Sequence, residues 1–449
     1  MEEKKLGKFD VFMALIVGLM FADAIASNSS AGVSSISWWV ILGVLFMIPS
    51  GAIIGELSGA YPGEGGIYVW IQEGLGPRWA AMTSWLFFAC GLFIPVSSFI
   101  MCSDILFNLF YPAAPYLLRV GMAIVLLWLM IWVSTLPMVE AKWVTNTAGL
   151  IKLSLFLLSF VAGIAYLVQG HALANSMSVN DLLPTLDQGL TYLPIIVYCC
   201  TGMELASASA EQTKNPAKTL PKIILGVAAL AVVLNVIANF GMLAVLPLDE
   251  IDLDFGLLDL YQAAFHSSVL YYIAGIAFLF AVFAQCVTWM IGANRGTAES
   301  GQASELPAVF GKENTAGQPI GAILISAIAG TLMMVVYAFL SESAADLFFS
   351  LLNCGVIGSL LPYVFMIVAY QRLKKQGMNG YTGFKCPCGI ALSWVVQIIQ
   401  CATLLLMVYI PGYGLADDIV TNVLGAAVMI ISGLIMMKIA EKQKQNAKE

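Results

Sequence analysis

Three ionisable residues stand inside long apolar stretches of this sequence: Asp23, Lys152 and Glu204. Burying a charge away from water is costly, so such a group normally faces a protein interior or a water-filled cavity and marks a functional site. Two carboxylates and an ammonium group are suited to binding a charged small molecule or to carrying protons. The apolar stretches contain no metal-ligand cluster, G-x-G-D acid pair or Ser/His arrangement, so the pattern indicates binding rather than covalent catalysis.

Two of these residues lie within segments of small and polar residues. Asp23 belongs to ADAIASNSSAG at 22–32, and Glu204 belongs to YCCTGMELASAS at 198–209. If both segments leave the helical path, the free N–H and C=O groups of the half-helices would hold the charged ends of a zwitterion or an amine. The alternative is that the serines bond back to their own helix or pack between helices.

The composition indicates which elements must position these residues. Of the 449 residues, 60% are hydrophobic and only 10% are charged, against about 25% charged in an ordinary soluble domain. A helical span needs about 20 mostly apolar residues. Hydropathy and helix-breaking residues therefore predict an all-α polytopic membrane protein with twelve spans, at residues 11–33, 36–60, 78–110, 116–136, 144–169, 189–212, 220–247, 268–298, 318–340, 344–371, 389–410 and 417–440.

The distribution of basic residues predicts the orientation of these spans. Lysines and arginines gather on the side of the two termini, whereas only Arg119 lies near the opposite face. The outer loops 169–188 and 248–267 carry Asp and Glu but no Lys or Arg. By the positive-inside rule, both termini are cytoplasmic in a multi-pass protein of the cell membrane. No cleavable signal pattern is expected at the start.

Other features limit the expected partners. Cys386 and Cys388 form one CxC in a polar loop, which is too little for a metal site, so we interpret them as reduced thiols. Glu56, at the inner end of the second span, is assigned to a helix end rather than to a substrate site. The expected partners are a small molecule and the lipid bilayer, with no nucleic acid, metal or cofactor, and the oligomeric state is open.

Three connecting segments carry dense Gly, Pro and Glu motifs. Residues 61–79 read YPGEGGIYVWIQEGLGPRW, residues 202–222 read GMELASASAEQTKNPAKTLPK, and residues 289–307 read WMIGANRGTAESGQASELP. They resemble the first inner loop, the sixth-span G-x-E motif with its following loop, and the end of the eighth span of amino acid/polyamine/organocation (APC) transporters. GPRW at 76–79 and FIPVSSF at 93–99 are most similar to the bacterial glutamate/GABA antiporter branch, with related amino acid/amine exchangers as neighbours.

The resemblance implies the architecture of the whole chain. Residues 1–449 would form a single membrane transport domain with a leucine-transporter-type core of two inverted five-span repeats, at 11–169 and 189–371. Spans 11 and 12 would follow at 389–440. The first and sixth spans would be broken.

The resemblance also implies substrate contacts, position by position. Ala26, Ser27 and Asn28 fall where the family usually shows a G-S-G-like cradle, of which only the serine matches. The other implied contacts are Tyr198 as an aromatic gate, Cys200, Thr201 and Gly202 along the second break, Glu204 as the family's glutamate, and Trp289 against the substrate side chain.

Lys152 falls where sodium-independent members of the family carry a lysine in place of a sodium ion. The resemblance therefore implies that no sodium is required, with Lys152 and Glu204 as candidates for proton or ion coupling. The alternative is that Lys152 extends its ammonium group to the membrane interface.

Two transport hypotheses remain open. In the first, the protein exchanges amino acids and/or amines, and Asp23 and Glu204 bind the ammonium groups of an amine-containing substrate. In the second, it is a general neutral or acidic amino acid antiporter or a proton-coupled symporter, and Asp23 caps a half-helix or pairs with Lys152. Both require alternating access without ATP, since no G-x-x-x-x-G-K-[ST] loop occurs. An intramembrane enzyme or a channel is the third, least supported class.

Overall fold

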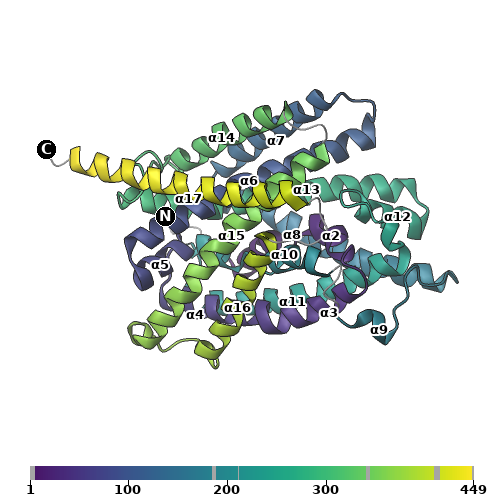
Figure 1. Cartoon of the computed structure of the whole chain (residues 1–449), viewed down its shortest axis with the longest axis horizontal. Helices are drawn as coiled ribbons and strands as arrows, with labels where there is room; N and C mark the ends of the chain where they lie inside the picture. Colours follow the sequence, from purple (N-terminus) through teal and green to yellow (C-terminus); the bar gives the residue numbers. More distant parts are fainter. Residues whose placement is uncertain (1–5, 185–188, 211, 340–343, 409–414, 447–449) are drawn as a thin grey trace.

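The computed structural model describes residues 6–184, 189–210, 212–339, 344–408 and 415–446, and in these ranges the regular structure is helical (Figure 1). Ten helices of this part are long and apolar enough to cross a membrane. Two shorter apolar helices, Leu193–Ser209 and Ile320–Val336, fall in the predicted sixth and ninth spans. The prediction of an all-α polytopic architecture is confirmed. Residues 211, 340, 409 and 410 of the predicted spans lie outside the described ranges.

Short helical turns alternate with long helices along the chain. The elements are α1 (Lys8–Leu19), η1 (Ala22–Ala24), α2 (Ile25–Ser29), α3 (Ser34–Leu42), η2 (Gly43–Met47), α4 (Ile48–Ala60), α5 (Ile67–Leu75), α6 (Pro77–Phe110), α7 (Tyr116–Ser134), α8 (Met138–Val168), α9 (Val179–Leu182), α10 (Gly189–Cys199), η3 (Met203–Ser209), α11 (Pro216–Val245), η4 (Leu248–Glu250), α12 (Gly256–Phe265), α13 (Ser268–Gln302), α14 (Ile320–Ala338), α15 (Ala344–Lys375), η5 (Met378–Gly380), α16 (Gly389–Val408) and α17 (Leu415–Asn446).

Three long helices form the centre of the bundle. Helix α6 packs along both α13 and α15. Within the apolar 18-residue stretch that qualifies α6 as a candidate span, 94% is buried. Helix α8 packs against α11 and α1, and α4 packs against α11. Helix α17 lies at the periphery (Figure 1), and only 17% of its corresponding apolar stretch is buried. Outward apolar side chains such as Trp132 and Leu405 form the kind of surface that a bilayer requires.

Two apolar segments leave the α-helical path. Helix α1 ends at Leu19, because Met20 (φ −92°, ψ 100°) is extended and Phe21 (φ −88°, ψ 87°) is also outside the helical region. The chain then continues through η1 and α2. Helix α10 ends at Cys199, and Gly202 adopts φ 104° before the 3₁₀-helix η3. Glycine suits this left-handed position because it has no Cβ atom. Both departures lie in the small-residue segments that the sequence singled out.

The two connections predicted to lie on the outer side contain more structure than the sequence indicated. Residues 248–267 are expected to form a loop, but the structure places η4 and α12 there. In α12, Leu257, Leu260, Tyr261 and Ala264 are buried, and the helix packs against α8 and α13. This spacing is typical of an amphipathic helix, so burial of one face explains why the segment is helical. The other of these two connections, 169–188, contains the short helix α9.

Asp254, just before α12, should make the stability of the protein depend on pH. Burial and the nearby carboxylates of Asp252 and Asp104 raise the pKa of Asp254 from 3.8 to about 6. The folded protein therefore binds this proton more tightly than the unfolded chain does, and the free energy of unfolding falls as the pH rises from about 4 to about 6. We expect Asp254→Asn to reduce this slope and to stabilise the protein at neutral pH by about 1 to 2 kcal/mol.

Thermal unfolding in detergent at a series of pH values measures this effect. Asp249→Asn is the matched control, because Asp249 is an exposed acid of the neighbouring η4. It should keep the wild-type slope. An Asp254→Asn variant with the same slope as the wild type would contradict the prediction.

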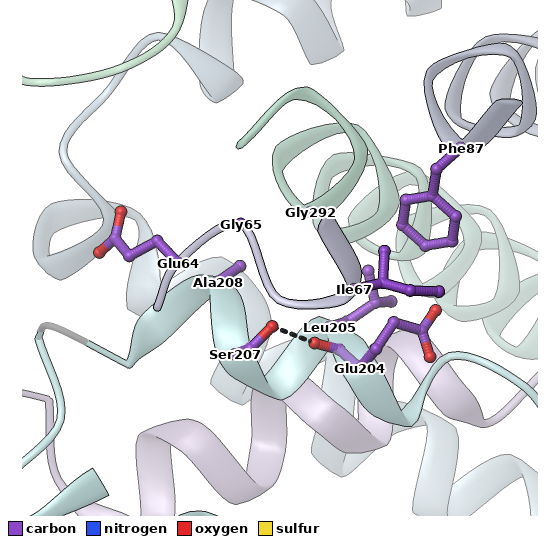
Figure 2. Close-up of a pocket in the computed structure, with 9 residues that line it drawn as sticks. All are labelled: Glu64, Gly65, Ile67, Phe87, Glu204, Leu205, Ser207, Ala208 and Gly292. Atoms are coloured by element: carbon purple, nitrogen blue, oxygen red, sulfur yellow. Dashed lines mark hydrogen bonds between the residues drawn. The ribbon is translucent and has the colours of Figure 1, made fainter. Parts of the chain in front are cut away.

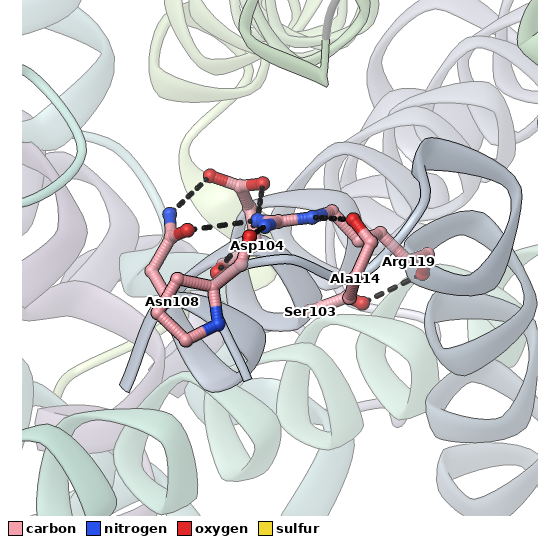
Figure 3. A network of polar contacts seen from close by, with 6 residues as sticks. Ser103, Asp104, Asn108, Ala114 and Arg119 are labelled. Atoms are coloured by element: carbon pink, nitrogen blue, oxygen red, sulfur yellow. Dashed lines mark hydrogen bonds and ion pairs between the residues drawn. The ribbon is translucent and has the colours of Figure 1, made fainter. Parts of the chain in front are cut away.

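Arg119 holds the connection between α6 and α7 (Figure 3). Its guanidinium donates to Asp104 Oδ1 at 2.5 Å, Asn108 Oδ1 at 3.0 Å and Pro112 O at 2.8 Å. Ser103 Oγ donates to the carbonyl oxygen of Arg119 at 2.6 Å. The basic residue expected on the outer face is therefore engaged in the fold.

Candidate substrate site

Lys152 lies against the end of α1. The residue is 0% exposed, and its Nζ donates to Val17 O at 2.7 Å and Met20 O at 2.5 Å. It also donates to Gln285 Oε1. The last carbonyls of a helix lack intrahelical partners and carry partial negative charge, so an ammonium group is stabilised there. Lys152 is thus buried at the first interruption instead of extending to an interface.

Asp23 lies in η1, just beyond that interruption. Gln285 of α13 donates from Nε2 to both carboxylate oxygens, at 3.3 and 3.2 Å. Because Gln285 also accepts a hydrogen bond from Lys152, one amide connects the carboxylate to the ammonium group. The sequence alternative in which Asp23 pairs with Lys152 takes this indirect form.

Asp23 borders a small cavity. The described residues that line the cavity are Phe21, Asp23, Ala24, Ser27, Ile94, Ile195, Tyr198 and Val356. Among them, Asp23 supplies the one charged group, and the hydroxyls of Ser27 and Tyr198 are the other side-chain polar groups. A carboxylate beside aromatic and aliphatic walls suits an ammonium group whose organic part lies on those walls.

Four aromatic rings extend from this cavity toward a second one. The Tyr198 ring centroid lies 4.9 Å from that of Phe21 and 6.2 Å from that of Trp289. Phe87, which lines the second cavity, lies 6.0 Å from Trp289. Trp289 Nε1 donates to Gly18 O at 3.0 Å, which fixes the indole against the end of α1. The Tyr198 hydroxyl has no hydrogen-bond partner among the described residues, so a polar group of a substrate can bind it.

Glu204 lines the second cavity (Figure 2). Its Oε2 accepts a hydrogen bond from the hydroxyl of Tyr363 in α15, and that hydroxyl accepts one from the Gly202 N–H at 2.8 Å. Glu204 is only 3% exposed, and its Oε1 has no partner within the described part of the chain. A proton on this carboxyl group would lower the cost of burying it. Asp23 and Glu204 therefore line separate cavities.

Several predicted residues surround the interruptions without lining the cavity at Asp23. Asn28 Nδ2 donates to Cys199 Sγ at 3.8 Å, and Thr201 Oγ1 donates to Tyr198 O at 2.7 Å. Cys200 is fully buried, and Ala26 faces Gly256 at the start of α12. Of the predicted substrate residues, the structure brings Asp23, Ser27 and Tyr198 together in this cavity. Trp289 does not line it, but its ring lies next to the rings of Phe21 and Tyr198, which do.

Sequence reasoning missed Gln285, Tyr363 and Phe21. Gln285 could have been identified from the sequence, because it is a polar residue in an apolar run. It also lies four positions before Trp289 and hence on the same helix face. Tyr363 and Phe21 left none, since aromatic residues are common in membrane helices.

The loop before α5 covers the cavity at Glu204. Glu64 pairs with Arg295 of α13 at 2.9 Å, and the Gly65 N–H donates to Glu299 Oε1 at 2.6 Å. Glu64 and Gly65 also line that cavity (Figure 2). These two contacts tie the loop to α13 beside the cavity.

Glu56 has a structural role, as its position at a helix end suggested. Its Oε2 accepts from Tyr370 Oη at 2.8 Å and from the Cys386 N–H at 3.0 Å, and its Oε1 pairs with Lys374. Cys386 and Cys388 are both free thiols in the structure. Glu56 thus joins α4 to α15 and to the segment before α16.

A side chain at Gly202 should impair transport. An added Cβ would lie 3.2 Å from Trp289 Cζ2 and 3.4 Å from Gly18 O, on a residue with φ 104°. A residue with a Cβ atom in this left-handed conformation is strained by about 1 to 2 kcal/mol. We therefore expect the Gly202→Ala variant to transport about 10-fold more slowly than the wild type in proteoliposomes. Gly226→Ala on α11 is the matched control, because nothing lies within 4 Å of its added Cβ. Equal transport rates in the two variants would contradict the prediction.

The fold is similar to that of a solved membrane protein. A solved structure of a manganese transporter from Eremococcus coleocola aligns with a TM-score of 0.61 over 97% of this chain and 94% of that chain. The sequence identity is 15%, so this similarity concerns the fold alone.

The chain belongs to the amino acid permease family, whose family model matches residues 6–438. The predicted membership of the APC transporters is therefore confirmed, and the chain is a multi-pass membrane transporter, not an enzyme. A probable agmatine/putrescine antiporter of Lactococcus lactis is 26% identical over 97% of this chain and 95% of its own length. A glutamate/gamma-aminobutyrate antiporter of the same organism is 22% identical over 84% and 78%, respectively.

Proposed function

We propose that this protein is a secondary transporter that exchanges amino acids and/or amines without sodium and favours an amine-containing substrate. The observation that carries the proposal is the cavity in which Asp23 faces Phe21 and Tyr198. A carboxylate and aromatic faces both attract a cation. The names of the relatives agree with this chemistry, since agmatine, putrescine and gamma-aminobutyrate all carry amino or guanidino groups.

Lys152 supports the absence of a sodium requirement. Its ammonium group already binds Val17 O and Met20 O at the end of α1. Backbone carbonyls at a helix break are the ligands that a sodium ion would use in such folds. A fixed positive charge therefore takes the place of the ion.

The proposal includes the finer architecture. Ten long candidate spans and two shorter apolar helices would give twelve spans, with the first and sixth broken at residues 20–21 and 200–202. Residues 11–169 and 189–371 would form the two repeats of one transport domain, followed by the last two spans. The protein would lie in the cell membrane (the inner or plasma membrane), with both termini in the cytoplasm.

The charge of Asp23 explains why the transporter would exchange substrates instead of returning empty. The bundle of spans 1, 2, 6 and 7 would move against the other helices and open the cavity to each side in turn. An empty site leaves the Asp23 carboxylate without a bound cation in a closing, low-dielectric cavity, which is costly. A bound ammonium group removes that cost, so return of the loaded carrier is favoured over return of the empty one.

Proteoliposomes test this exchange. Uptake of a labelled amine should be at least about 10-fold faster into liposomes preloaded with amine or amino acid than into empty ones, because about 1.4 kcal/mol of extra barrier is enough for that ratio. Replacing sodium by potassium should leave the rate unchanged. Equal uptake into empty liposomes would contradict exchange, and loss of uptake without sodium would contradict the role of Lys152.

A second candidate is a proton-coupled amino acid symporter or a general amino acid antiporter. The unpartnered Oε1 of buried Glu204 favours it, because this carboxyl group is placed to take up a proton. In that case a pH gradient alone should drive uptake of neutral amino acids into empty proteoliposomes. Exchange that is insensitive to the gradient would exclude the symporter.

A further inference from the structure

Gln285 connects the two buried charges at the first interruption. It is fully buried on α13, accepts from Lys152 through Oε1, and donates through Nε2 to both oxygens of Asp23. Lys152 comes from α8 and Asp23 from η1, so the amide joins three elements.

Chemistry alone sets the orientation of this amide. A lysine ammonium group can only donate hydrogen bonds, and an ionised carboxylate can only accept them. The amide oxygen must therefore face Lys152, and the amide nitrogen must face Asp23. The opposite orientation would place N–H groups against the ammonium and an oxygen against the carboxylate.

Lys152 has no donor left for Asp23. An ammonium group has three N–H donors, and Lys152 uses them on Val17 O, Met20 O and Gln285 Oε1. Lys152 would have to release a carbonyl at the end of α1 in order to bind Asp23 directly. Gln285 satisfies both charges without that rearrangement.

We propose that Gln285 is a positioning residue for cation recognition: it keeps the Asp23 carboxylate toward the cavity while Lys152 stays on the end of α1. The proposal rests on the proposed amine transport and names the residue that keeps its acid available. Opposite charges attract strongly in a low-dielectric interior. Without the amide, Asp23 and Lys152 would form a direct pair, and the substrate would have to break that pair in order to bind.

The Gln285→Glu variant tests this role through pH. A protonated carboxyl group replaces the amide well, because its C=O accepts from Lys152 and its O–H donates to Asp23. An ionised carboxylate still accepts from Lys152, but it repels Asp23. We expect the KM for the amine in Gln285→Glu to rise about 10-fold or more between about pH 5.5 and about pH 8, with kcat changed less than about 3-fold.

The pH profile must be compared with that of the wild type. The thiols of Cys102, Cys199 and Cys286 and the phenol of Tyr198 also lie near Asp23 or Lys152. Their titration is common to both proteins. Gln400→Glu is the matched control, since Gln400 is a fully buried amide in α16. Its pH profile should follow that of the wild type.

Gln285→Met keeps the test decisive if the acidic variant does not fold. It removes both hydrogen bonds and should give a KM about 10-fold higher at every pH. The proposal is overturned if Gln285→Glu follows the wild-type profile, or if Gln285→Met keeps the wild-type KM. If the wild type exchanges only neutral amino acids, the amine preference fails, and the same comparison on that substrate still decides the role of Gln285.

Discussion

Lys152→Met should abolish exchange, with a rate at least about 100-fold below that of the wild type. The methionine leaves the carbonyls of Val17 and Met20 without the donor that binds them in the wild type. It also leaves Asp23 without its compensating charge. Removing one partner of a buried charged pair typically costs about 3 to 5 kcal/mol of stability. Exchange in proteoliposomes and thermal unfolding in detergent measure the two effects.

Lys142→Met is the matched control for this loss. Lys142 lies on the same helix, its side chain is 43% exposed, and it pairs with Asp10 at 3.4 Å. Such a surface pair contributes at most about 1 kcal/mol. If Lys152→Met does not fold, Lys152→Arg retains the charge and should still transport poorly, because a planar guanidinium cannot reproduce the three bonds of the ammonium. Wild-type transport by both Lys152 variants would contradict a fixed cation at this site.

Asp23→Asn should weaken competition by amines by about 10- to 150-fold, the range expected for about 1.5 to 3 kcal/mol from a charge-assisted hydrogen bond. The amide keeps the shape of the side chain but loses the charge that faces the cavity. Competition by each compound against a labelled substrate measures the effect.

Asp10→Asn is the control for this substitution, because Asp10 belongs to α1 but contacts Lys142 and Asn146 instead of the cavity. It should leave the competition profile unchanged. A different outcome would support the structural role for Asp23: if the carboxylate only caps a half-helix, Asp23→Asn lowers the midpoint of thermal unfolding and leaves the same compounds competing.

The sequence predicted the architecture and the charged residues better than their contacts. Asp23, Lys152 and Glu204 were identifiable because ionisable groups are rare in apolar runs. The separation of Asp23 and Glu204 into two cavities was not predictable, since it depends on the aromatic rings between them.

Contacts between distant segments were also hidden from the sequence. Gln285 and Asp23 are 262 positions apart, so only the packing of α13 beside η1 reveals their hydrogen bonds. Similarly, α12 was missed because a short amphipathic segment between two spans resembles a loop until its buried face is seen.

The most direct test of the central claim is a competition assay with the wild-type protein. Preloaded proteoliposomes exchange a labelled substrate in the presence of excess diamines, monoamines or neutral amino acids. An amine-binding cavity at Asp23 predicts that the diamines or monoamines compete strongly. Competition by neutral amino acids, with none by either kind of amine, would contradict it.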